Sequence, residues 1–168
     1  MDYVIFLIHV KGYNSLLNVQ NLNVTFNTRK GEVEAVKDIS FNLKKGEILG
    51  IVGESGSGKS VTSYALMKIL DNTGVIKANK LIYSGIDLEN ATEKEMMDIR
   101  GREVSMIFQN PRTSLNPIRK IGKQIEDVLK RHSQANRYNA KQKAIEALKA
   151  VKIKDPENRY YSYPYELS

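Results

Sequence analysis

The chain contains no cysteine and only two histidines among its 168 residues. Without cysteine, neither a disulfide framework nor a thiolate metal site can form. No segment approaches the roughly 20 consecutive apolar residues that cross a bilayer as a helix. The apolar run Tyr3 to Val10 is too short for that role and lacks the basic start and small-residue cleavage site of a signal peptide. We expect this run to be an edge strand or an extension ahead of the domain.

The positive charge is concentrated in the last third of the chain. The net charge is +7, and residues 119–168 hold 12 Lys/Arg against 6 Asp/Glu. Solvated helix faces are the usual cause of such a bias, and anionic lipid headgroups are an alternative. No basic patch interleaved with aromatic residues and no known reading motif is present, so we expect no nucleic-acid partner. The hydrophobic content of 41% is sufficient for the core of one domain.

Residues 53–60 read Gly-Glu-Ser-Gly-Ser-Gly-Lys-Ser and match the phosphate loop G-x-x-x-x-G-K-[ST]. Glycines let the backbone turn tightly, so that successive N–H groups can point at phosphate oxygens. Lys59 can reach the β- and γ-phosphates of a nucleotide, and the hydroxyl of Ser60 suits Mg²⁺, which prefers oxygen ligands. We therefore predict a nucleotide site formed by Gly53, Glu54, Ser55, Gly56, Ser57, Gly58, Lys59, Ser60 and Val61.

The segments on either side of the loop favour this prediction over a Gly/Ser turn that binds nothing. Residues 47–52 form a short apolar run rich in branched side chains, which predicts a buried strand. Residues 61–70 place apolar side chains at spacings of three and four, which predicts a helix. The order strand, glycine loop, helix is the required context, because the N-terminus of the helix adds further N–H groups that bind anions.

The rest of the chain predicts further strands and helices. Three short alternating segments before the loop, residues 16–26, 33–36 and 39–43, predict a small antiparallel sheet ahead of a three-layer α/β core. Thr92 and Glu95 have the spacing of a capping box, which opens a helix to about Ile99. Further strands are expected at residues 80–84 and 104–108, helices at 118–131 and 140–151, and a short final helix after Asp155-Pro156.

Apolar residues recur along one face of each of the two later helices. In the first, this spacing predicts that Ile118, Ile121, Ile125, Val128 and Leu129 face the core. In the second, Asn139 is the expected N-cap. The side chains expected to face inward there are Ala144, Ile145, Leu148 and Val151.

Several further segments accompany the phosphate loop. They are Asn-Val-Thr-Phe at 23–26, Ala-Val-Lys-Asp-Ile-Ser-Phe at 35–41, Met-Ile-Phe-Gln-Asn-Pro-Arg-Thr-Ser-Leu-Asn-Pro at 106–117, and Tyr-Pro-Tyr-Glu-Leu-Ser at 163–168. With them the chain resembles the nucleotide-binding subunit of an ABC transporter, in particular the ATPases of the oligopeptide, dipeptide and nickel importer group. The resemblance implies an incomplete P-loop NTPase fold of α/β class: an extension at 1–15, a β subdomain with the phosphate-loop core at 16–110, and a helical subdomain at 111–168.

The resemblance also implies roles for residues outside the loop. Phe26 stands where the family places an aromatic ring that stacks on adenine, and Val36 would pack beside that ring; the alternative for Phe26 is an ordinary core aromatic. Gln109 would contact Mg²⁺ together with Ser60 and report the γ-phosphate to the membrane partner. The implied cofactors are ATP and Mg²⁺.

Partners and location follow from the same resemblance. It implies a peripheral protein at the cytoplasmic face of the cell membrane that couples ATP hydrolysis to uptake of peptides or chelated nickel or another metal. Its partners would be membrane-spanning permease subunits, a second ATPase subunit and, indirectly, an extracytoplasmic solute-binding protein. Residues 111–131 would face the coupling helix of a permease subunit.

Two family motifs are missing from the sequence. Leu167-Ser168 matches only the first two positions of Leu-Ser-Gly-Gly-Gln, and no run of four apolar residues precedes an Asp-Glu pair. Neither His9 nor His132 is placed as the switch histidine, so no catalytic residue is predicted. We expect the N-terminal part of a longer protein, with weak nucleotide binding and negligible turnover, because phosphoryl transfer to water needs a group that positions the nucleophile. The alternatives are another P-loop enzyme, such as a kinase or GTPase, and a non-catalytic remnant of a frameshifted gene.

Overall fold

The computed structural model describes residues 6–8, 15–108, 114–132 and 134–167. The chain divides into two units, Met1–Gln109 and Asn110–Ser168. The first unit contains seven strands and two helices within its described residues: β1 (Phe6–Ile8), β2 (Ser15–Thr28), β3 (Gly31–Lys44), α1 (Lys59–Leu66), β4 (Gly74–Lys77), β5 (Lys80–Tyr83), β6 (Ile86–Asp87), α2 (Glu93–Ile99) and β7 (Val104–Met106). The second contains α3 (Ile121–Arg131), α4 (Ala140–Ala150), α5 (Pro156–Arg159) and a short 3₁₀-helix (Pro164–Glu166).

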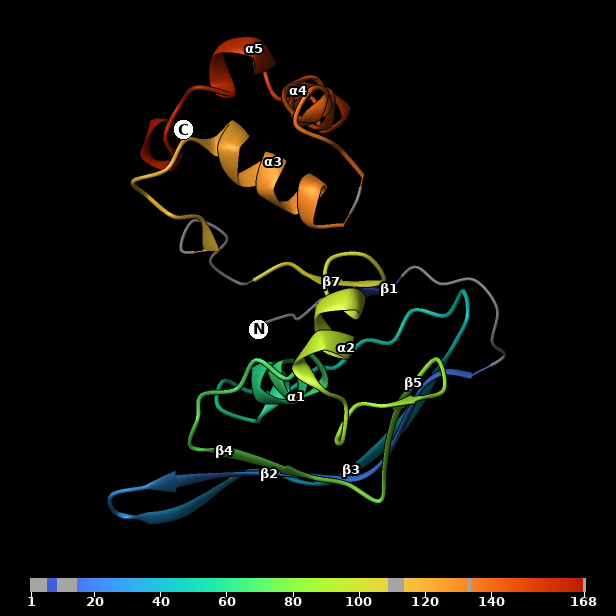
Figure 1. Ribbon diagram of the computed structural model, residues 1–168. Helices are drawn as coiled ribbons and strands as arrows, with labels where there is room; N and C mark the ends of the chain where they lie inside the picture. The colour runs from blue at the N-terminus through green and yellow to red at the C-terminus, as the bar shows by residue number, and fades with distance from the viewer. Residues whose placement is uncertain (1–5, 9–14, 109–113, 133, 168) are drawn as a thin grey trace. The chain divides into compact units, whose positions relative to one another are not determined.

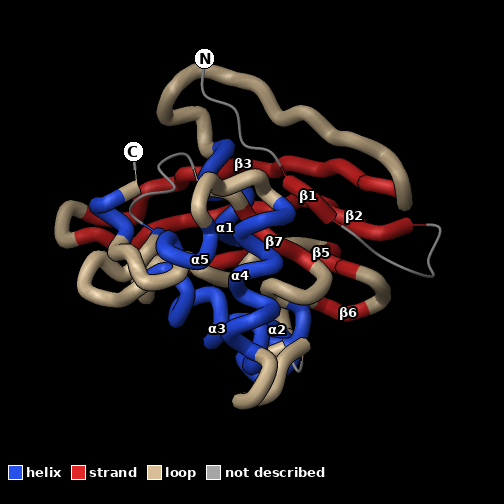
Figure 2. Tube along the Cα trace, turned by 90° about the horizontal axis from the view of Figure 1, so that it is seen from above, coloured by secondary structure: helices blue, strands red, loops and turns tan. Residues whose placement is uncertain are grey.

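A long antiparallel hairpin, β2 with β3, forms the body of the sheet (Figure 2). The two strands predicted at 33–36 and 39–43 are one strand, because the polar pair between them forms an irregularity and not a turn. Asp38 there has φ of 46°, and Asn21 opposite it has φ of 51°. The side-chain amide of Asn21 donates a hydrogen bond of 2.6 Å to the Asp38 carboxylate. The hairpin thus passes through this point without losing its pairing on either side.

Shorter strands complete this antiparallel sheet, whose prediction is confirmed. Its order is β3-β2-β5-β6, and β4 also pairs with β2. The sequence analysis missed β4 and β6, which have four and two residues and show little alternation. Side chains from β2 and β5 point into a common core; the most deeply buried are Val19, Leu22, Val24, Leu81 and Tyr83.

Helices α1 and α2 cover one face of the sheet (Figure 1). The capping box at the start of α2 is present: Glu95 N–H donates to Thr92 Oγ1, and Thr92 N–H donates to the Glu95 carboxylate. Helix α1 ends at Leu66, earlier than predicted. Arg100 caps the C-terminal end of this helix. The Arg100 guanidinium donates to the carbonyls of Met67 and Lys68 at 2.7 and 2.8 Å.

The strand predicted at residues 47–52 does not form, and only Ile51 carries a β-bridge. These residues carry no strand, and Ile48 and Val52 are 97% and 70% exposed. A buried parallel strand needs neighbours with which to pair. Among the described residues, the compact strand β7 pairs only with β1, in an antiparallel two-stranded sheet.

The second unit has its own small core, in which α3 and α4 pack together (Figure 1). The buried residues that form this cluster are Ile121, Ala144, Ile145, Leu148 and Tyr160. Three residues predicted to face inward are exposed instead: Ile118 by 82%, Val128 by 54% and Val151 by 68%. Ile118 precedes the first turn of α3, and Val151 follows the last turn of α4. Val128 is exposed because the buried face of α3 also contains Gly122 and Glu126, which rotates this face away from Val128.

Glu126 is a carboxylate almost fully enclosed in this core. Its side chain is 4% exposed and accepts hydrogen bonds from Lys130 at 2.7 Å, from Lys123 at 3.1 Å and from the Tyr160 hydroxyl. Burial raises the pKa of Glu126, but the bonds from Lys130, Tyr160 and Lys123 outweigh it and lower the pKa to about 2. Burial, and the bond to Glu126, raise the pKa of Tyr160.

Glu126 should make the second unit sensitive to acid. Its pKa is about 2 when folded and 4.5 otherwise, so the unfolded state binds more protons between these values. The stabilisation is present above pH 4.5 and is lost as the pH falls through 2; we expect it to be about 3 kcal/mol. Thermal unfolding of Glu126→Gln should show a flatter pH dependence than the wild type across this range. The exposed carboxylate Glu146, changed to Gln, is the control, and equal pH slopes for both variants would contradict the assignment.

Candidate nucleotide-binding site

Residues 53–58 form a tight loop that runs directly into α1. Gly56 and Gly58 have φ of +83° and +85°, in the left-handed region where side chains are strained. Gly58 is constrained a second time, because a Cβ atom there would lie 2.6 Å from the carbonyl oxygen of Ala35. The loop therefore approaches the backbone of β3 at a position that only glycine tolerates.

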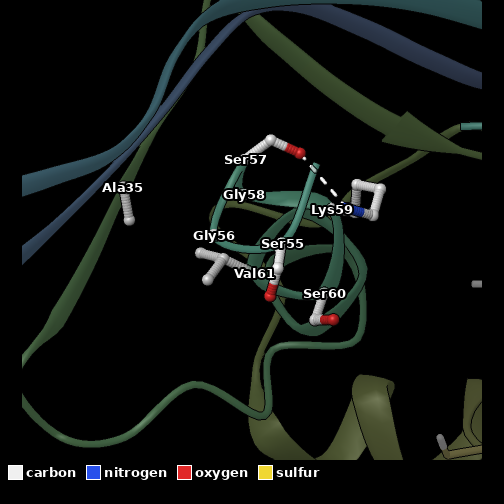
Figure 3. Close-up of a pocket in the computed structure, with 8 residues that line it drawn as sticks. All are labelled: Ala35, Ser55, Gly56, Ser57, Gly58, Lys59, Ser60 and Val61. Carbon is white, nitrogen blue, oxygen red and sulfur yellow. Dashed lines mark hydrogen bonds between the residues drawn. The ribbon is translucent and has the colours of Figure 1, made fainter. Parts of the chain in front are cut away.

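The Lys59 side chain is hydrogen-bonded to the main chain of the same loop. Its side chain is buried, and its ammonium group donates to the carbonyls of Gly53 and Glu54 at 2.9 and 2.6 Å. It also donates to the hydroxyl of Ser57 at 3.3 Å, the contact drawn in Figure 3. Gly53 and Glu54 thus contribute through their main-chain oxygens. A buried cation is costly unless it is paired, so these contacts fix the position of the ammonium group.

The loop surrounds an open cavity of about 180 Å³ at the start of α1. Its lining contains Ser55, Gly56, Ser57, Gly58, Lys59, Ser60 and Val61, and Ala35 faces it from β3 (Figure 3). The first N–H groups of an α-helix have no partner inside the helix and carry partial positive charge. Pockets that enclose a whole drug-sized ligand are about 300–1,000 Å³. The cavity therefore fits a phosphate tail, and the donors around it suit phosphate oxygens.

Three predicted site residues do not line the cavity: Val36 and Phe26 lie elsewhere in the first unit, and Gln109 is not among the residues that the structure describes. Val36 is buried, and its side chain would be 3.2 Å from a Cβ atom at Gly58, so it supports the loop from behind. Phe26 is half-buried against the core of the first unit and is not among the described residues that line the cavity. Phe26 can therefore be either the ring that stacks on adenine or an ordinary aromatic residue of the core. Gln109, the second predicted Mg²⁺ ligand, lies outside the described residues.

Ala35 is the lining residue that the sequence analysis did not assign to the site. It lies far ahead of the loop in the sequence and has no polar group, so its residue type does not indicate that it lines a phosphate site. The indication was indirect: glycine at position 58 permits close approach of another backbone, and that backbone is Ala35 of β3.

Comparison with known proteins shows the family of this chain. The ABC transporter family model matches residues 36–168, most of the sequence. The chain belongs to the ABC transporter family. It is 49% identical over 154 residues to the oligopeptide transport ATP-binding protein OppD of Bacillus subtilis, an alignment covering 91% of this chain and 43% of that protein. It is 47% identical over 154 residues to the dipeptide transport ATP-binding protein DppD of Escherichia coli, covering 92% of this chain and 47% of that protein. The chain thus spans about half the length of the curated relatives it matches.

A solved structure places this ABC family chain in a known fold. The ATP-binding cassette MJ0796, in a dimeric post-hydrolysis state with ADP and Pi, aligns with a TM-score of 0.71 and 21% identity. The alignment covers 91% of this chain and 63% of that one. The prediction of an incomplete P-loop NTPase fold of the ABC type is confirmed. Within its described residues, the structure has no helix that is both long and apolar enough to cross a bilayer.

Proposed function

We propose that the chain is part of the ATP-binding subunit of an ABC importer that takes up peptides. The family assignment and the printed functions of OppD and DppD, which are peptide transport ATP-binding proteins, support this choice. The single observation that carries it is the glycine loop that runs directly into α1 around a phosphate-sized cavity, with Lys59 and Ser60 in the lining.

Different residues of the loop would contact different parts of ATP. The N–H groups at the start of α1 and the Lys59 ammonium group would neutralise the phosphate tail, since both present positive charge to the cavity. Ser60, in the first turn of α1, would hold Mg²⁺ together with Gln109, and Mg²⁺ would add further charge neutralisation. Phe26 would stack on the base, which a cavity of about 180 Å³ leaves outside, and Val36 would support the loop at Gly58.

The carboxylate that positions the attacking water has no counterpart in this sequence. We therefore propose that the chain binds Mg-ATP weakly and releases phosphate no faster than a variant without Lys59. The complete subunit would hydrolyse ATP at the cytoplasmic face of the membrane, docked on permease subunits and paired with a second ATPase subunit. An extracytoplasmic binding protein would deliver the peptide.

Thermal unfolding with and without Mg-ATP tests this proposal. A ligand that binds only the folded state stabilises it by about 2.7 kcal/mol at 100 times its dissociation constant. For a chain of this length we expect the melting temperature to rise by about 5–10 °C. GTP at the same concentration should produce a smaller rise; an equal or larger one would favour a GTPase. No shift with any nucleoside triphosphate would refute the proposal.

A further inference from the structure

The ring of Phe26 lies against a glycine at the start of β4. Phe26 of β2 pairs with Gly74, and the two strands run side by side (Figure 1). A Cβ atom on Gly74 would lie 3.1 Å from the Cε1 atom of the Phe26 ring. The same atom would lie 3.0 Å from the Cβ atom of Leu70 and 3.2 Å from the carbonyl oxygen of Asp71. A side chain at position 74 would therefore have to displace one of these neighbours.

Glycine is needed at position 74 for space and not for its backbone freedom. Gly74 is not among the described glycines with a positive φ, so its backbone would accept alanine without strain. The atoms met on Leu70 and Asp71 are a Cβ atom and a main-chain oxygen, which move only with the backbone. That backbone is fixed, because Gly74 N–H donates to the Asp71 carbonyl at 2.8 Å. The Phe26 ring, which is only half-buried, is therefore the neighbour that would move.

One continuous stretch of chain connects this contact to the phosphate cavity. It begins in the lining of the cavity with Ser60 and ends at Gly74. On β2, Phe26 lies two residues beyond Val24, which pairs with Val36, the residue whose side chain supports the loop. Two residues of a strand span about 7 Å. The Phe26 ring therefore lies near the proposed nucleotide site and not in a remote part of the core.

We propose that Gly74 is a positioning residue, which sets the orientation of the Phe26 ring for stacking on the base of the nucleotide. The inference rests on the proposed function, in which Phe26 makes this stack. Because Phe26 is only half-buried, part of the residue is accessible to a ligand while the edge of its ring is fixed against Gly74. Stacking depends on the relative orientation of the two rings, and a base stacked on an aromatic side chain gains about 5- to 150-fold in affinity.

Titration calorimetry of the full chain with two ligands tests the proposal: Mg-ATP, and Mg-tripolyphosphate, which has a phosphate tail but no base. Gly74→Ala should weaken ATP binding by about fivefold, because the displaced ring stacks poorly, and should leave tripolyphosphate binding within about twofold. Phe26→Ala should weaken ATP binding by at least about fivefold, because it removes the ring. Adding Gly74→Ala to Phe26→Ala should cause no further loss, since the new methyl group then has no ring to displace.

Gly50→Ala makes the same substitution where a Cβ atom meets nothing within 4 Å, and it should leave both affinities unchanged. Equal weakening of ATP and tripolyphosphate by Gly74→Ala would overturn the inference, because it would show a general disturbance of the fold. So would unchanged ATP binding by Gly74→Ala, or a further loss when it is added to Phe26→Ala.

Failure of this inference can be told apart from failure of the proposed function. If the wild type binds both ligands and Phe26→Ala binds ATP equally well, the ring does not contact the base; the role of Gly74 is then wrong, but the phosphate site stands. If the wild type binds neither ligand, the proposed function is refuted together with this inference.

Discussion

Replacing Lys59 with alanine should weaken Mg-ATP binding by at least about 100-fold, the loss expected for two charge-assisted hydrogen bonds at roughly 1.5–3 kcal/mol each. In the structure the ammonium group is fixed at the loop by the carbonyls of Gly53 and Glu54. Its three N–H groups are bonded to Gly53, Glu54 and Ser57, so binding a phosphate tail means exchanging these bonds for bonds to phosphate oxygens. Titration with a fluorescent ATP analogue, with Mg²⁺ present, measures the effect.

Lys45→Ala is the control for this experiment, because Lys45 is an exposed lysine in the turn just before the loop. It removes the same charge and should leave the dissociation constant within about twofold, since exposed charges are screened by salt. Nucleotide binding by Lys59→Ala at wild-type strength would mean that the cavity at α1 is not the site. Circular dichroism spectra of both variants should match the wild type, which separates lost binding from lost folding.

The conformation of the phosphate loop could be predicted from the sequence because it is local. The phosphate loop occupies eight consecutive residues, and the left-handed glycines at 56 and 58 and the start of α1 follow from that segment alone. The antiparallel sheet was also predictable, since alternation along β2 and β3 reports a half-buried strand without knowledge of its partner. Ala35 was not predictable in the same way, because its role depends on which backbone comes close to Gly58.

Features that depend on distant partners were predicted poorly. Residues 47–52 have the composition of a buried strand, yet Ile48 and Val52 are exposed, because a strand forms only where a neighbour supplies hydrogen bonds. The prediction of which face of α3 is buried was partly wrong for a related reason. Periodicity counts apolar residues, so it could not show that Glu126 is buried beneath Tyr160 or that Gly122 lies under the same ring.

Gly122 is the position in the second unit where a small substitution should do the most damage. The ring of Tyr160 lies directly against it, and an added Cβ atom would overlap three carbon atoms of that ring. The main chains are joined at the same place, where Gly122 N–H donates to the Tyr160 carbonyl at 2.9 Å. A glycine inside a helix normally costs about 1 kcal/mol relative to alanine. Here glycine is the stabilising choice, since it lets the ring reach Glu126.

Gly122→Ala should therefore destabilise the second unit by about 3 kcal/mol, despite the better helix propensity of alanine, because overpacking a filled core costs about 1–3 kcal/mol and the Glu126–Tyr160 bond is disturbed as well. Amide hydrogen exchange of α3 and α4 measures the effect in this unit alone. Gly50→Ala is the matched control, because a Cβ atom there meets nothing within 4 Å. Adding Tyr160→Leu to Gly122→Ala removes the overlapping ring, so the second change should cost less in this background than in the wild type. If the two costs simply add, close packing of Gly122 on Tyr160 is not what holds α3 in place.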